Sequence, residues 1–489
     1  MKLTELLAGL ADVAAKVEIA GLALDSRQVK PGFAFIALAG SAQHGIAHVE
    51  QALDHGAIAV IYDPAAGGQA QANKTGSAVM VAIPDLTQRL GLIGARFYRH
   101  PSQSMAVIGV TGTNGKTTCS QFLAQVLPAC GVIGTMGWGC WGQLRHTLNT
   151  TPDALAIQGM LHELLVSEKK NVVMEVSSHG LEQGRVNGVR IRGALFTNLS
   201  RDHLDYHGSM DDYLAAKIKL FARPELEFAV LNMDDPRAER ILNRIADAVT
   251  VWGFTQQAVE LAIDERVYAK NIVEGLDGIR MDVVWREAEV SLHSGIVGLY
   301  NVENILAVLT VLLAMDMSLE QAVDRLAGLK PVAGRMENFG GHGRPSVFVD
   351  YAHSPDALEK VLAGLKPHCR GRLRVVFGCG GERDRGKRTQ MGAVAEKWAD
   401  DMVLTDDNPR TEPPEQIIAN ILKGCRGDKK VVHDRKQAIH EVIASAGRQD
   451  CVVVAGKGHE HYQEINGIRQ PFSDQRVVEQ ALAEWHEEQ

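Results

Sequence analysis

The stretch TGTNGKTT, residues 111–118, contains the glycine, lysine and hydroxyl side chains of a phosphate-binding loop. Its two glycines let backbone amides approach phosphate oxygens, and a helix that starts behind them adds positive potential. Lys116 can reach the β- and γ-phosphates of a nucleotide, and the Thr117 hydroxyl can bind Mg²⁺. The spacing departs from the usual GxxxxGK[ST], because Val110 occupies the first glycine position. A glycine-rich turn without a ligand is the alternative, which GKT between a strand-like and a helix-like segment disfavours.

Two further segments place candidate metal ligands downstream of this loop. Glu175 lies near the end of the apolar run 172–176, and a carboxylate at the carboxyl end of a strand is a good ligand for Mg²⁺. The alternative for Glu175 is a surface cap of the next turn. His203 and His207 have a spacing that could suggest zinc, but no Glu-x-x-His frame accompanies them. Lys217, in the helix-like segment AAKIK, is by physics alone a solvated lysine.

The stretch TDDNPRTEPP, residues 405–414, gathers acids, an amide, a proline and an arginine directly after an apolar run, Met402–Leu404. Its composition allows two interpretations. It is either an exposed polar turn, or a site for a small molecule that carries both ammonium and carboxylate groups.

The elements that must position these groups follow a pattern typical of α/β proteins with parallel sheets. Apolar strand-like runs alternate with helix-like segments, and the run 305–315 predicts a buried helix. The helix behind the phosphate loop is predicted over Ser120–Leu127. The expected strands are Phe33–Leu38, Ala57–Ile61, Ala78–Ile83, Met105–Val110, Val172–Val176, Ala194–Thr197, Val347–Val349, Leu373–Phe377, Met402–Leu404 and Cys451–Ala455. The polar stretch Arg99–Ser104 is predicted to be a linker.

The composition argues against several classes of protein. The chain has 489 residues, 45% of them hydrophobic, so we expect more than one packed domain. The net charge of −8 argues mildly against a nucleic-acid binder. The seven cysteines include no CxxC pair, which favours reduced thiols and a cytoplasmic protein. Apolar residues between Leu3 and Val13 recur at helical spacing rather than as a signal peptide, and no apolar run is long enough to span a membrane.

Together these motifs resemble the Mur ligase family, and the resemblance covers nearly the whole chain. The segments that carry it, in order, are TGTNGKTT, MEVSSHGL, TNLSRDHLDYHG, GRME, DYAHSPDAL, FGCGGERDRGKR, DDNPR and AGKGHE. The resemblance implies an N-terminal α/β domain for the UDP part of a substrate, a central P-loop ATPase domain and a C-terminal Rossmann-like domain for an amino acid. We expect these at residues 1–100, 101–332 and 333–489.

The implied reaction is ATP-dependent amide ligation that builds the peptidoglycan peptide. ATP phosphorylates the D-glutamyl γ-carboxylate of UDP-MurNAc-L-Ala-D-Glu, and the amine of meso-2,6-diaminopimelate then attacks the acyl phosphate. The expected cofactors are ATP and Mg²⁺. The expected partners are these small molecules, without nucleic acid or membrane insertion, and the family default is a cytoplasmic monomer.

The resemblance also implies roles at the nucleotide. The catalytic residues would be Lys116, Glu175, His203 and Lys217, with Lys217 modified by CO₂ to N6-carboxylysine. Thr117, Glu175, His203 and Lys217 would hold the metal. ATP would contact Gly112, Thr113, Asn114, Gly115, Lys116, Thr117, Thr118, Asn301, Asn304, Arg335 and Asp350, with His353 as a weaker candidate. The alternatives are a helix cap for Asn301 and surface salt bridges for Arg335 and Asp350.

The nucleotide dipeptide would contact a further set of residues: Leu24, Ser26, Ser41, Ala42, Gln43, Asn149, Thr150, Thr151, Ser177, Gln183 and Arg185. The loop at Ser41 departs from the family's His-Gln-Ala, so its contacts are expected to be mainly through the backbone. The segment 149–153 is also typical of a helix start with Pro152 at its first position.

Diaminopimelate would be bound by Arg383, Asp407, Asn408, Pro409, Arg410, Gly456 and Glu460. Diaminopimelate differs from lysine by one extra carboxylate, which Arg410 can pair with as a bidentate fork. Asn408 would hydrogen-bond the same group, and Pro409 would stiffen the loop. The rival hypotheses are an L-lysine-adding sister ligase, a folylpolyglutamate-type ligase and a P-loop ATPase that ligates nothing.

Overall fold

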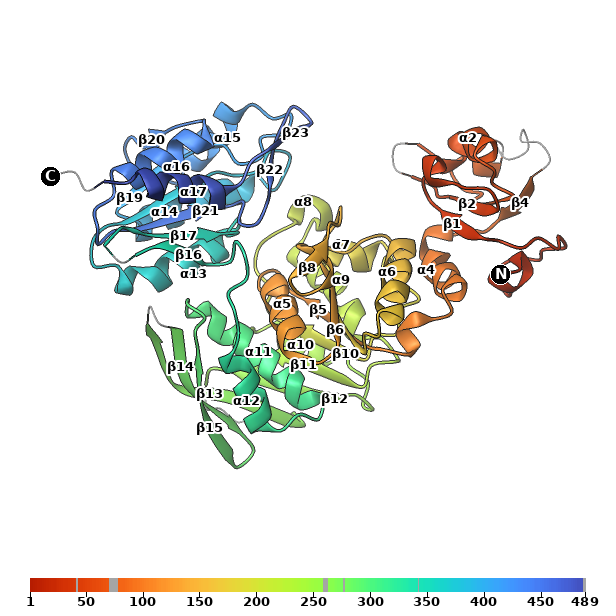
Figure 1. Cartoon of the computed structure of the whole chain (residues 1–489), viewed down its shortest axis with the longest axis horizontal. Helices are drawn as coiled ribbons and strands as arrows, with labels where there is room; N and C mark the ends of the chain where they lie inside the picture. The colour runs from red at the N-terminus through yellow and green to blue at the C-terminus, as the bar shows by residue number, and fades with distance from the viewer. Residues whose placement is uncertain (41–42, 70–77, 258–262, 276–277, 342, 487–489) are drawn as a thin grey trace. The chain divides into compact units, whose positions relative to one another are not determined.

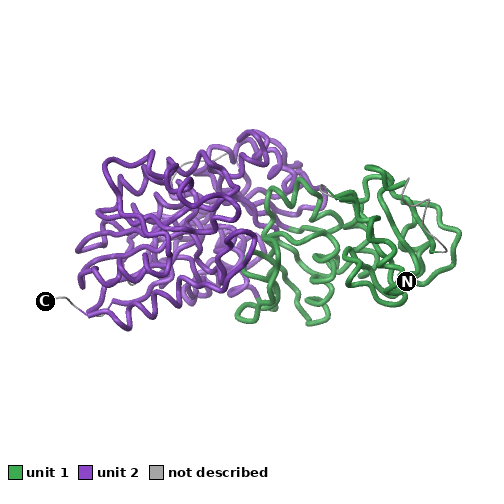
Figure 2. The backbone as a smooth tube through the Cα atoms, turned by 90° about the horizontal axis from the view of Figure 1, so that it is seen from above, with its two compact units in different colours: residues 1–108, 128–192 green, residues 109–127, 193–489 purple. Residues whose placement is uncertain are grey.

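The computed structural model describes residues 1–40, 43–69, 78–257, 263–275, 278–341 and 343–486 (Figure 1). The chain forms two compact units, which are residues 1–108 with 128–192, and residues 109–127 with 193–489 (Figure 2). Strand β5 (Ala106–Thr111) crosses from the first unit into the second. The predicted domain boundaries at residues 100 and 332 stay a prediction.

The first unit begins with a four-stranded, all-parallel sheet. Its strands are β1 (Gly21–Ala23), β2 (Phe33–Ala37), β3 (Ala59–Tyr62) and β4 (Val79–Ala82). Adjacent residues of β2 enter different cores, Ile36 beside helix α4 (Leu86–Phe97) and Phe35 beside helix α2 (Val49–Asp54). Because side chains alternate across a strand, this sheet is covered on both faces.

The N-terminal helix is shorter than its apolar spacing predicts. Helix α1 spans Leu3–Leu6, so the helical interpretation up to Val13 is wrong. Gly9 has a φ of +70°, a left-handed conformation that a continuing helix cannot contain.

The first unit continues with strands β6 (Cys130–Gly134), β7 (Gly137–Cys140), β8 (Gln143–Arg145) and β9 (Asn171–Glu175), which lie in the order β9-β6-β7-β8. The helices of this part of the unit are α6 (Ala154–Val166) and α7 (Ser178–Glu182). The prediction that Pro152 is the first residue of α6 is wrong, because Asp153 is the N-cap and accepts a hydrogen bond from the Ala156 amide at 2.9 Å. The predicted linker at residues 99–104 is instead an ordered turn, where buried Ser102 accepts a hydrogen bond from the Arg190 amide.

The second unit contains the sheet that follows the phosphate loop. The strands of this sheet are β10 (Gly193–Phe196), β11 (Phe228–Asn232), β12 (Thr250–Thr255), β13 (Glu265–Gly275), β14 (Gly278–Trp285) and β15 (Ala288–Ser294). The helices of this part of the unit are α5 (Lys116–Val126), α8 (Leu204–His207), α9 (Met210–Phe221), α10 (Ala238–Leu242), α11 (Tyr300–Ala314) and α12 (Leu319–Ala327). Strands β10 to β13 are parallel, and β13 to β15 are antiparallel. Helix α5 starts four residues before the predicted Ser120, directly behind Gly115. Helix α11 is buried along nearly its whole length, as the apolar run predicts.

The last part of the second unit is a six-stranded sheet in the order β16-β17-β21-β18-β19-β20. The strands are β16 (Glu337–Gly340), β17 (Ser346–Asp350), β18 (Leu373–Phe377), β19 (Asp401–Leu404), β20 (Lys430–Val431) and β21 (Cys451–Ala455). Helices α13 (Pro355–Leu365), α14 (Gly386–Trp398) and α15 (Pro414–Leu422) share one core with this sheet. Helices α16 (Arg435–Ala444) and α17 (Asp474–Glu484) share the other, and the hairpin β22 (Tyr462–Ile465) and β23 (Ile468–Pro471) follows β21.

The α/β class with parallel sheets is confirmed, and each expected strand coincides with an observed one to within a few residues. Strands β17, β18, β19 and β21 run parallel, so their carboxyl ends meet at one edge of the sheet. Asp350 and the segments 378–383, 405–410 and 456–460 begin there, where open α/β sheets bind ligands.

Candidate functional site

The phosphate loop connects β5 to α5 and is held by residues that follow β10. Gly112 and Gly115 have φ values of +154° and +84°. A Cβ atom at Gly112 would lie 1.9 Å from the Thr197 hydroxyl, so only glycine fits. Asn198 Oδ1 accepts a hydrogen bond from the Asn114 amide at 2.9 Å. The loop is therefore held in one conformation directly before the N-terminus of α5, the position at which P-loops bind phosphate.

Two lysines contact the same carbonyl group in this loop. Lys116 Nζ donates to the Gly112 oxygen at 2.9 Å, and Lys217 Nζ donates to it at 2.8 Å. Lys217 is only 1% exposed and lies over the Tyr213 ring, so the interpretation of a solvated lysine is wrong. Burial, and then the charge of Lys116, hold the pKa of Lys217 well below its usual value.

Asp202 lies at the centre of a cluster of cationic and imidazole groups. His203 Nε2 lies 3.5 Å and His353 Nε2 3.6 Å from one carboxylate oxygen, and Lys387 Nζ lies 3.6 Å from the other. Burial alone would raise the pKa of Asp202, but these neighbours outweigh burial and hold it well below its usual value. Asp202 and Lys387 were not among the predicted site residues, although both lie inside the motifs RDHLD and RGKR.

A pocket next to the phosphate loop is lined by six of the eleven residues predicted to contact ATP. Asn114, Gly115, Thr118, Asn304, Arg335 and Asp350 all line it. Asn301 is buried and accepts from Asn304 Nδ2 at 2.9 Å, so it is not the N-cap of α11, which is Leu299. Arg335 lies over the Tyr351 ring at 4.5 Å, and Asp350 is buried and accepts two backbone amides. Surface salt bridges are therefore the wrong interpretation of these two residues.

In the first unit, Glu175 is the centre of a second group of contacting polar side chains. The Glu175 side chain is fully buried at the end of β9, which contradicts a surface cap. The Thr135 amide donates to its Oε1 at 2.9 Å, and the Thr135 hydroxyl lies 3.0 Å from both Glu175 Oε2 and Thr150 Oγ1. A Cβ atom at Gly134 would lie 2.3 Å from Glu175 Oε1, so this glycine makes room for the carboxylate. Thr135 was not predicted, although it directly follows β6 as Glu175 ends β9.

Residues predicted to bind the nucleotide dipeptide extend this group of contacts around Glu175. The Thr151 hydroxyl donates to the Glu175 carbonyl at 2.9 Å and lies 3.1 Å from Ser177 Oγ. Arg185 donates to the Thr151 carbonyl at 2.7 Å and to Gln183 Oε1. Asn149 is exposed beside them.

The remaining predicted dipeptide residues lie around the first sheet. Leu24 follows β1, and the Ser26 hydroxyl donates to Gln51 Oε1 at 2.7 Å. Gln43 is exposed, and Ser41 and Ala42 lie outside the described residues.

The DDNPR segment is not an exposed turn. Asp407 is 8% and Asn408 4% exposed. Asn408 Nδ2 donates to Glu460 Oε2 at 2.9 Å, which joins two predicted binding residues. Arg410 has a φ of +54°, its amide donates to the Glu464 carbonyl of β22, and its side chain donates to the Gly381 carbonyl at 2.7 Å. Hairpin β22–β23 thus fixes the backbone from which Arg410 projects.

A buried ion pair ties this segment to the loop after β18. Arg388, which is fully buried, donates to both oxygens of Glu412 at 2.8 Å, and the Glu382 amide donates to the same carboxylate. Arg383 is exposed in that loop, and a Cβ atom at Gly380 would lie 3.6 Å from Arg383 Cγ and 3.0 Å from Arg410 Nη1. The side chains of Arg383 and Arg410 therefore both lie close to Gly380.

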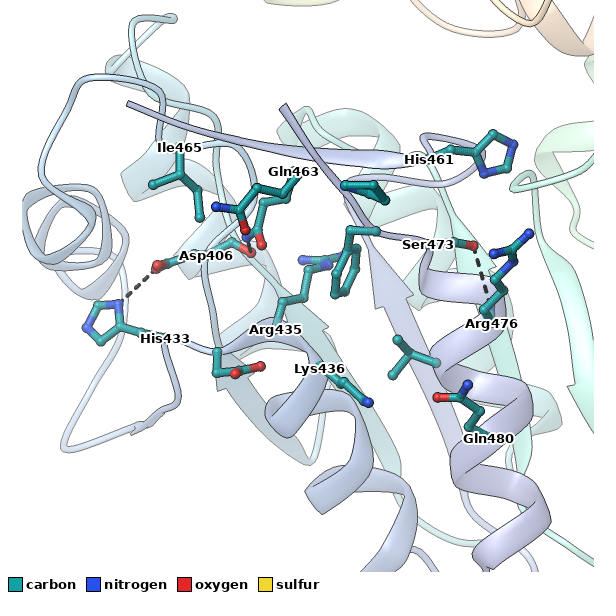
Figure 3. A pocket seen from close by; sticks show the side chains of 15 residues that line it. Asp406, His433, Arg435, Lys436, His461, Gln463, Ile465, Ser473, Arg476 and Gln480 are labelled. Carbon is teal, nitrogen blue, oxygen red and sulfur yellow. Dashed lines mark hydrogen bonds and ion pairs between the residues drawn. The ribbon is translucent and has the colours of Figure 1, made fainter. Parts of the chain in front are cut away.

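A separate pocket of about 820 Å³ lies between the starts of α16 and α17 and hairpin β22–β23 (Figure 3). Asp406 lines it and contacts His433 Nδ1 at 2.8 Å. The cations Lys436 and Arg476 also line this pocket, but the carboxylates of Asp406 and Asp434 offset their charge. None of the predicted diaminopimelate-binding residues lines it.

Among the predicted metal ligands, Thr117 and Glu175 have the hard oxygen donors that Mg²⁺ prefers, whereas His203 has a ring nitrogen. The Thr117 hydroxyl is in the first turn of α5, and the Glu175 carboxylate ends a strand. Within the described ranges, no group of three or more His, Cys, Asp and Glu side chains is arranged to hold a metal. Unmodified Lys217 donates a hydrogen bond, so it becomes a ligand only as an anionic carbamate.

The phosphate loop, the pocket behind it and the polar strand ends define an α/β protein of the P-loop mononucleotide-binding class. Models of the Mur ligase catalytic, middle and glutamate ligase domains match residues 18–98, 110–312 and 334–458. The chain belongs to the Mur ligase family.

Individual relatives align over nearly the whole chain. The UDP-N-acetylmuramoyl-L-alanyl-D-glutamate–2,6-diaminopimelate ligase of Ectopseudomonas mendocina is 46% identical, covering 96% of each chain. The ligase of the same name from Pseudomonas aeruginosa is 46% identical over 95% of each chain. A solved structure of an enzyme with this name is 37% identical and covers 99% of each chain with a TM-score of 0.68. In the described residues, no helix is long and apolar enough to cross a membrane.

Proposed function

We propose that this chain is an ATP-dependent amide ligase that joins meso-2,6-diaminopimelate to the D-glutamyl γ-carboxylate of UDP-N-acetylmuramoyl-L-alanyl-D-glutamate. ADP and phosphate are the other products. The relatives named above act on these compounds, and the observation in this chain that carries the proposal is the Asn408–Glu460 pair beside Arg410 in a P-loop protein. The reaction belongs to peptidoglycan precursor synthesis in the cytoplasm, and the chain acts as a monomer.

The first chemical step transfers the γ-phosphoryl group of ATP to the substrate carboxylate. A carboxylate is a poor acyl donor at neutral pH, and its conversion to an acyl phosphate, a mixed anhydride, lets phosphate leave when the amine attacks the carbonyl carbon. Both reactants are anions, so the step needs positive charge between them. Lys116 and the amides of the phosphate loop supply it from the protein. Mg²⁺, when bound by Thr117, Glu175, His203 and the carbamate of Lys217, would screen the phosphate oxygens further.

The environment of Lys217 supports its carbamylation. Reaction with CO₂ requires the neutral amine, and the lowered pKa of Lys217 favours that form. The carbamate changes a cation near Lys116 into an anion, so repulsion between two ammonium groups becomes attraction.

The group around Glu175 binds the dipeptide end of the nucleotide substrate. Arg185 is the cation in this group, and its fork suits a carboxylate or a phosphate. Thr150, Thr151, Ser177 and Gln183 supply neutral donors and acceptors, and Asn149 is exposed to the substrate. Leu24, Ser26 and the loop from Ser41 to Gln43 hold the uridine end.

The strand ends of the last sheet bind diaminopimelate. Arg410 and Arg383 pair with carboxylates, and Asp407 and Glu460 accept from an ammonium group. Gly456 lets the chain pass close to Asp407, because a Cβ atom there would lie 2.5 Å from Asp407 Oδ2. Lysine would leave Arg410 without a counter-charge, so the site discriminates between the two amino acids.

The test measures phosphate release with ATP, UDP-MurNAc-L-Ala-D-Glu and one amino acid at a time, namely meso-diaminopimelate, L-lysine or L-ornithine. We expect release that depends on the nucleotide dipeptide and is fastest with diaminopimelate. Equal or better use of lysine would point to the sister ligase. Release that needs neither the dipeptide nor an amino acid would identify an ATPase that does not ligate.

A further inference from the structure

The lysine in the loop after β21 has no role in the proposed reaction, yet it contacts two residues that are proposed to bind diaminopimelate. Lys457 follows β21, a strand enclosed between β17 and β18, and its side chain is fully buried. Its Nζ atom donates to Asn408 Oδ1 and to Glu460 Oε2, both at 2.9 Å. Because Asn408 Nδ2 also donates to Glu460 Oε2, the three side chains form a closed triangle.

This triangle determines which way the Asn408 amide faces. Lys457 Nζ and the Glu464 backbone amide both donate to Asn408 Oδ1, each at 2.9 Å. An ammonium group and an amide N–H have no acceptor, so the amide oxygen must face them and the NH₂ group must face away. One N–H of that group bonds Glu460, and the second has no partner among the described residues. Asn408 therefore presents a donor, as Arg410 does, which suits a carboxylate.

The same lysine also lowers the pKa of a neighbouring acid, Asp407. Burial would raise the pKa of Asp407, but Lys457 first and Arg435 next outweigh burial, and the pKa is lowered. Glu460 makes direct contact with Lys457, and its side chain is 18% exposed. A partly exposed carboxylate that is held in one position suits a substrate ammonium group.

Stability alone is a weak explanation for this lysine. A fully buried ammonium group loses its hydration, and a well-packed apolar side chain is often as stabilising as a buried ion pair. Two glycines next to Lys457, Gly456 and Gly458, have positive φ values of +117° and +49°, so the loop is shaped around it.

We propose that Lys457 is a positioning residue that orients Asn408 as a carboxylate-binding donor and Glu460 as an ammonium-binding acceptor. This inference rests on the proposed function, because it assigns Lys457 to the diaminopimelate site. Lys457 acts through its two neighbours and does not touch the substrate.

The test compares Lys457→Met, which keeps the length of the side chain without its charge, with Lys366→Met. Lys366 forms an exposed ion pair with Asp400 in the same sheet region. We expect Lys457→Met to raise the KM for diaminopimelate by about tenfold or more, since two hydrogen bonds to charged groups are lost. The KM for ATP should stay within about twofold, and Lys366→Met should leave both constants unchanged.

A double-mutant cycle with Asn408→Ala separates positioning from general destabilisation. If Lys457 acts through Asn408, the effects of Lys457→Met and Asn408→Ala on the KM for diaminopimelate will be less than additive. Fully additive effects, or equal increases in the KM values for ATP and diaminopimelate, would overturn the inference. Lys457→Gln, which is shorter and neutral but polar, gives a second variant if Lys457→Met does not fold.

The wild-type enzyme distinguishes this inference from the proposed function. If the wild type does not use diaminopimelate, the proposed function fails. If the wild type uses it and Lys457→Met keeps the wild-type KM, the role of Lys457 fails alone.

Discussion

Lys116 and Lys217 donate to one carbonyl oxygen, that of Gly112, at 2.9 and 2.8 Å. Two ammonium groups that share one acceptor repel each other, and Lys217 is only 1% exposed, so little water can screen the charge. The arrangement favours either a neutral amine or its anionic carbamate at Lys217. The second form also gives the phosphate loop a carboxylate-like group that can orient a metal.

Lys217→Ala should nearly abolish turnover, because no other side chain can supply the carbamate at that position. Added bicarbonate should not restore activity, since alanine has no amine for CO₂ to modify. The control is Lys219→Ala, which removes an exposed lysine from the same helix α9. Intact-protein mass spectrometry of the wild type in bicarbonate should show the addition of one CO₂, absent from the variant. Full activity of Lys217→Ala would refute the role of the carbamate.

Thr135→Val should lower kcat by roughly ten- to hundredfold with little change in the overall fold. The substitution keeps the volume of the side chain but removes the hydroxyl that lies 3.0 Å from Glu175 and from Thr150. Loss of a hydrogen bond to a charged group costs about 1.5–3 kcal/mol, and 1.4 kcal/mol is a factor of ten in rate.

The matched control for Thr135 is Thr310→Val. Thr310 is also buried, and its hydroxyl donates to the Leu306 carbonyl within α11. Steady-state rates of ADP formation should separate the two variants. Equal losses in both would indicate a general packing effect and not a role for Thr135 at Glu175.

Much of the fold could be predicted from the sequence, because apolar runs of strand length are local signals. The boundaries failed where backbone conformation mattered more than hydrophobicity. Helix α1 ends at Leu6 despite its apolar spacing. Helix α5 starts at Lys116 because Gly115, the residue before it, has a left-handed conformation. Neither feature leaves a periodic signal.

The candidate site divides in a similar way. The motifs indicated candidate residues but not their burial, so Lys217, Glu175 and Asp407 could each be interpreted as surface residues. Thr135, Asp202 and Lys457 were missed because their roles depend on contacts far apart in sequence. Lys457 meets Asn408 across 49 positions, and Thr135 meets Glu175 across 40. A single sequence carries no sign of such pairs.

Arg410→Ala should raise the KM for diaminopimelate by roughly a hundredfold and leave the KM for ATP within about twofold. A bidentate pair between an arginine and a carboxylate contributes two charged hydrogen bonds, and their loss accounts for this factor. The control is Arg469→Ala, which removes an exposed arginine from the hairpin that contacts Arg410. Similar increases for both substrates would show that Arg410 supports the domain and does not read the carboxylate.

The ion pair of Arg388 and Glu412 makes stability depend on pH below about 5. The hydrogen bonds from Arg388 lower the pKa of Glu412 to about 2 against an ordinary value of 4.5. A depressed pKa means that the folded chain binds the proton less readily than the unfolded chain. The stabilisation is therefore complete above pH 4.5 and is lost as the pH falls toward 2.

Glu412→Gln removes this dependence, because glutamine does not titrate. We expect the wild type to be more stable than the variant at pH 7, since a variant that leaves Arg388 buried without its counter-charge loses about 3–5 kcal/mol. Between pH 5 and 3.5 the difference should shrink by roughly 1 kcal/mol, because each unit of pKa shift corresponds to about 1.4 kcal/mol. Urea unfolding at both pH values measures it, with Glu415→Gln, an exposed neighbour in α15, as the control. A difference that is constant with pH would mean that Glu412 titrates alike in the folded and unfolded chain, and that Arg388 does not hold it ionised.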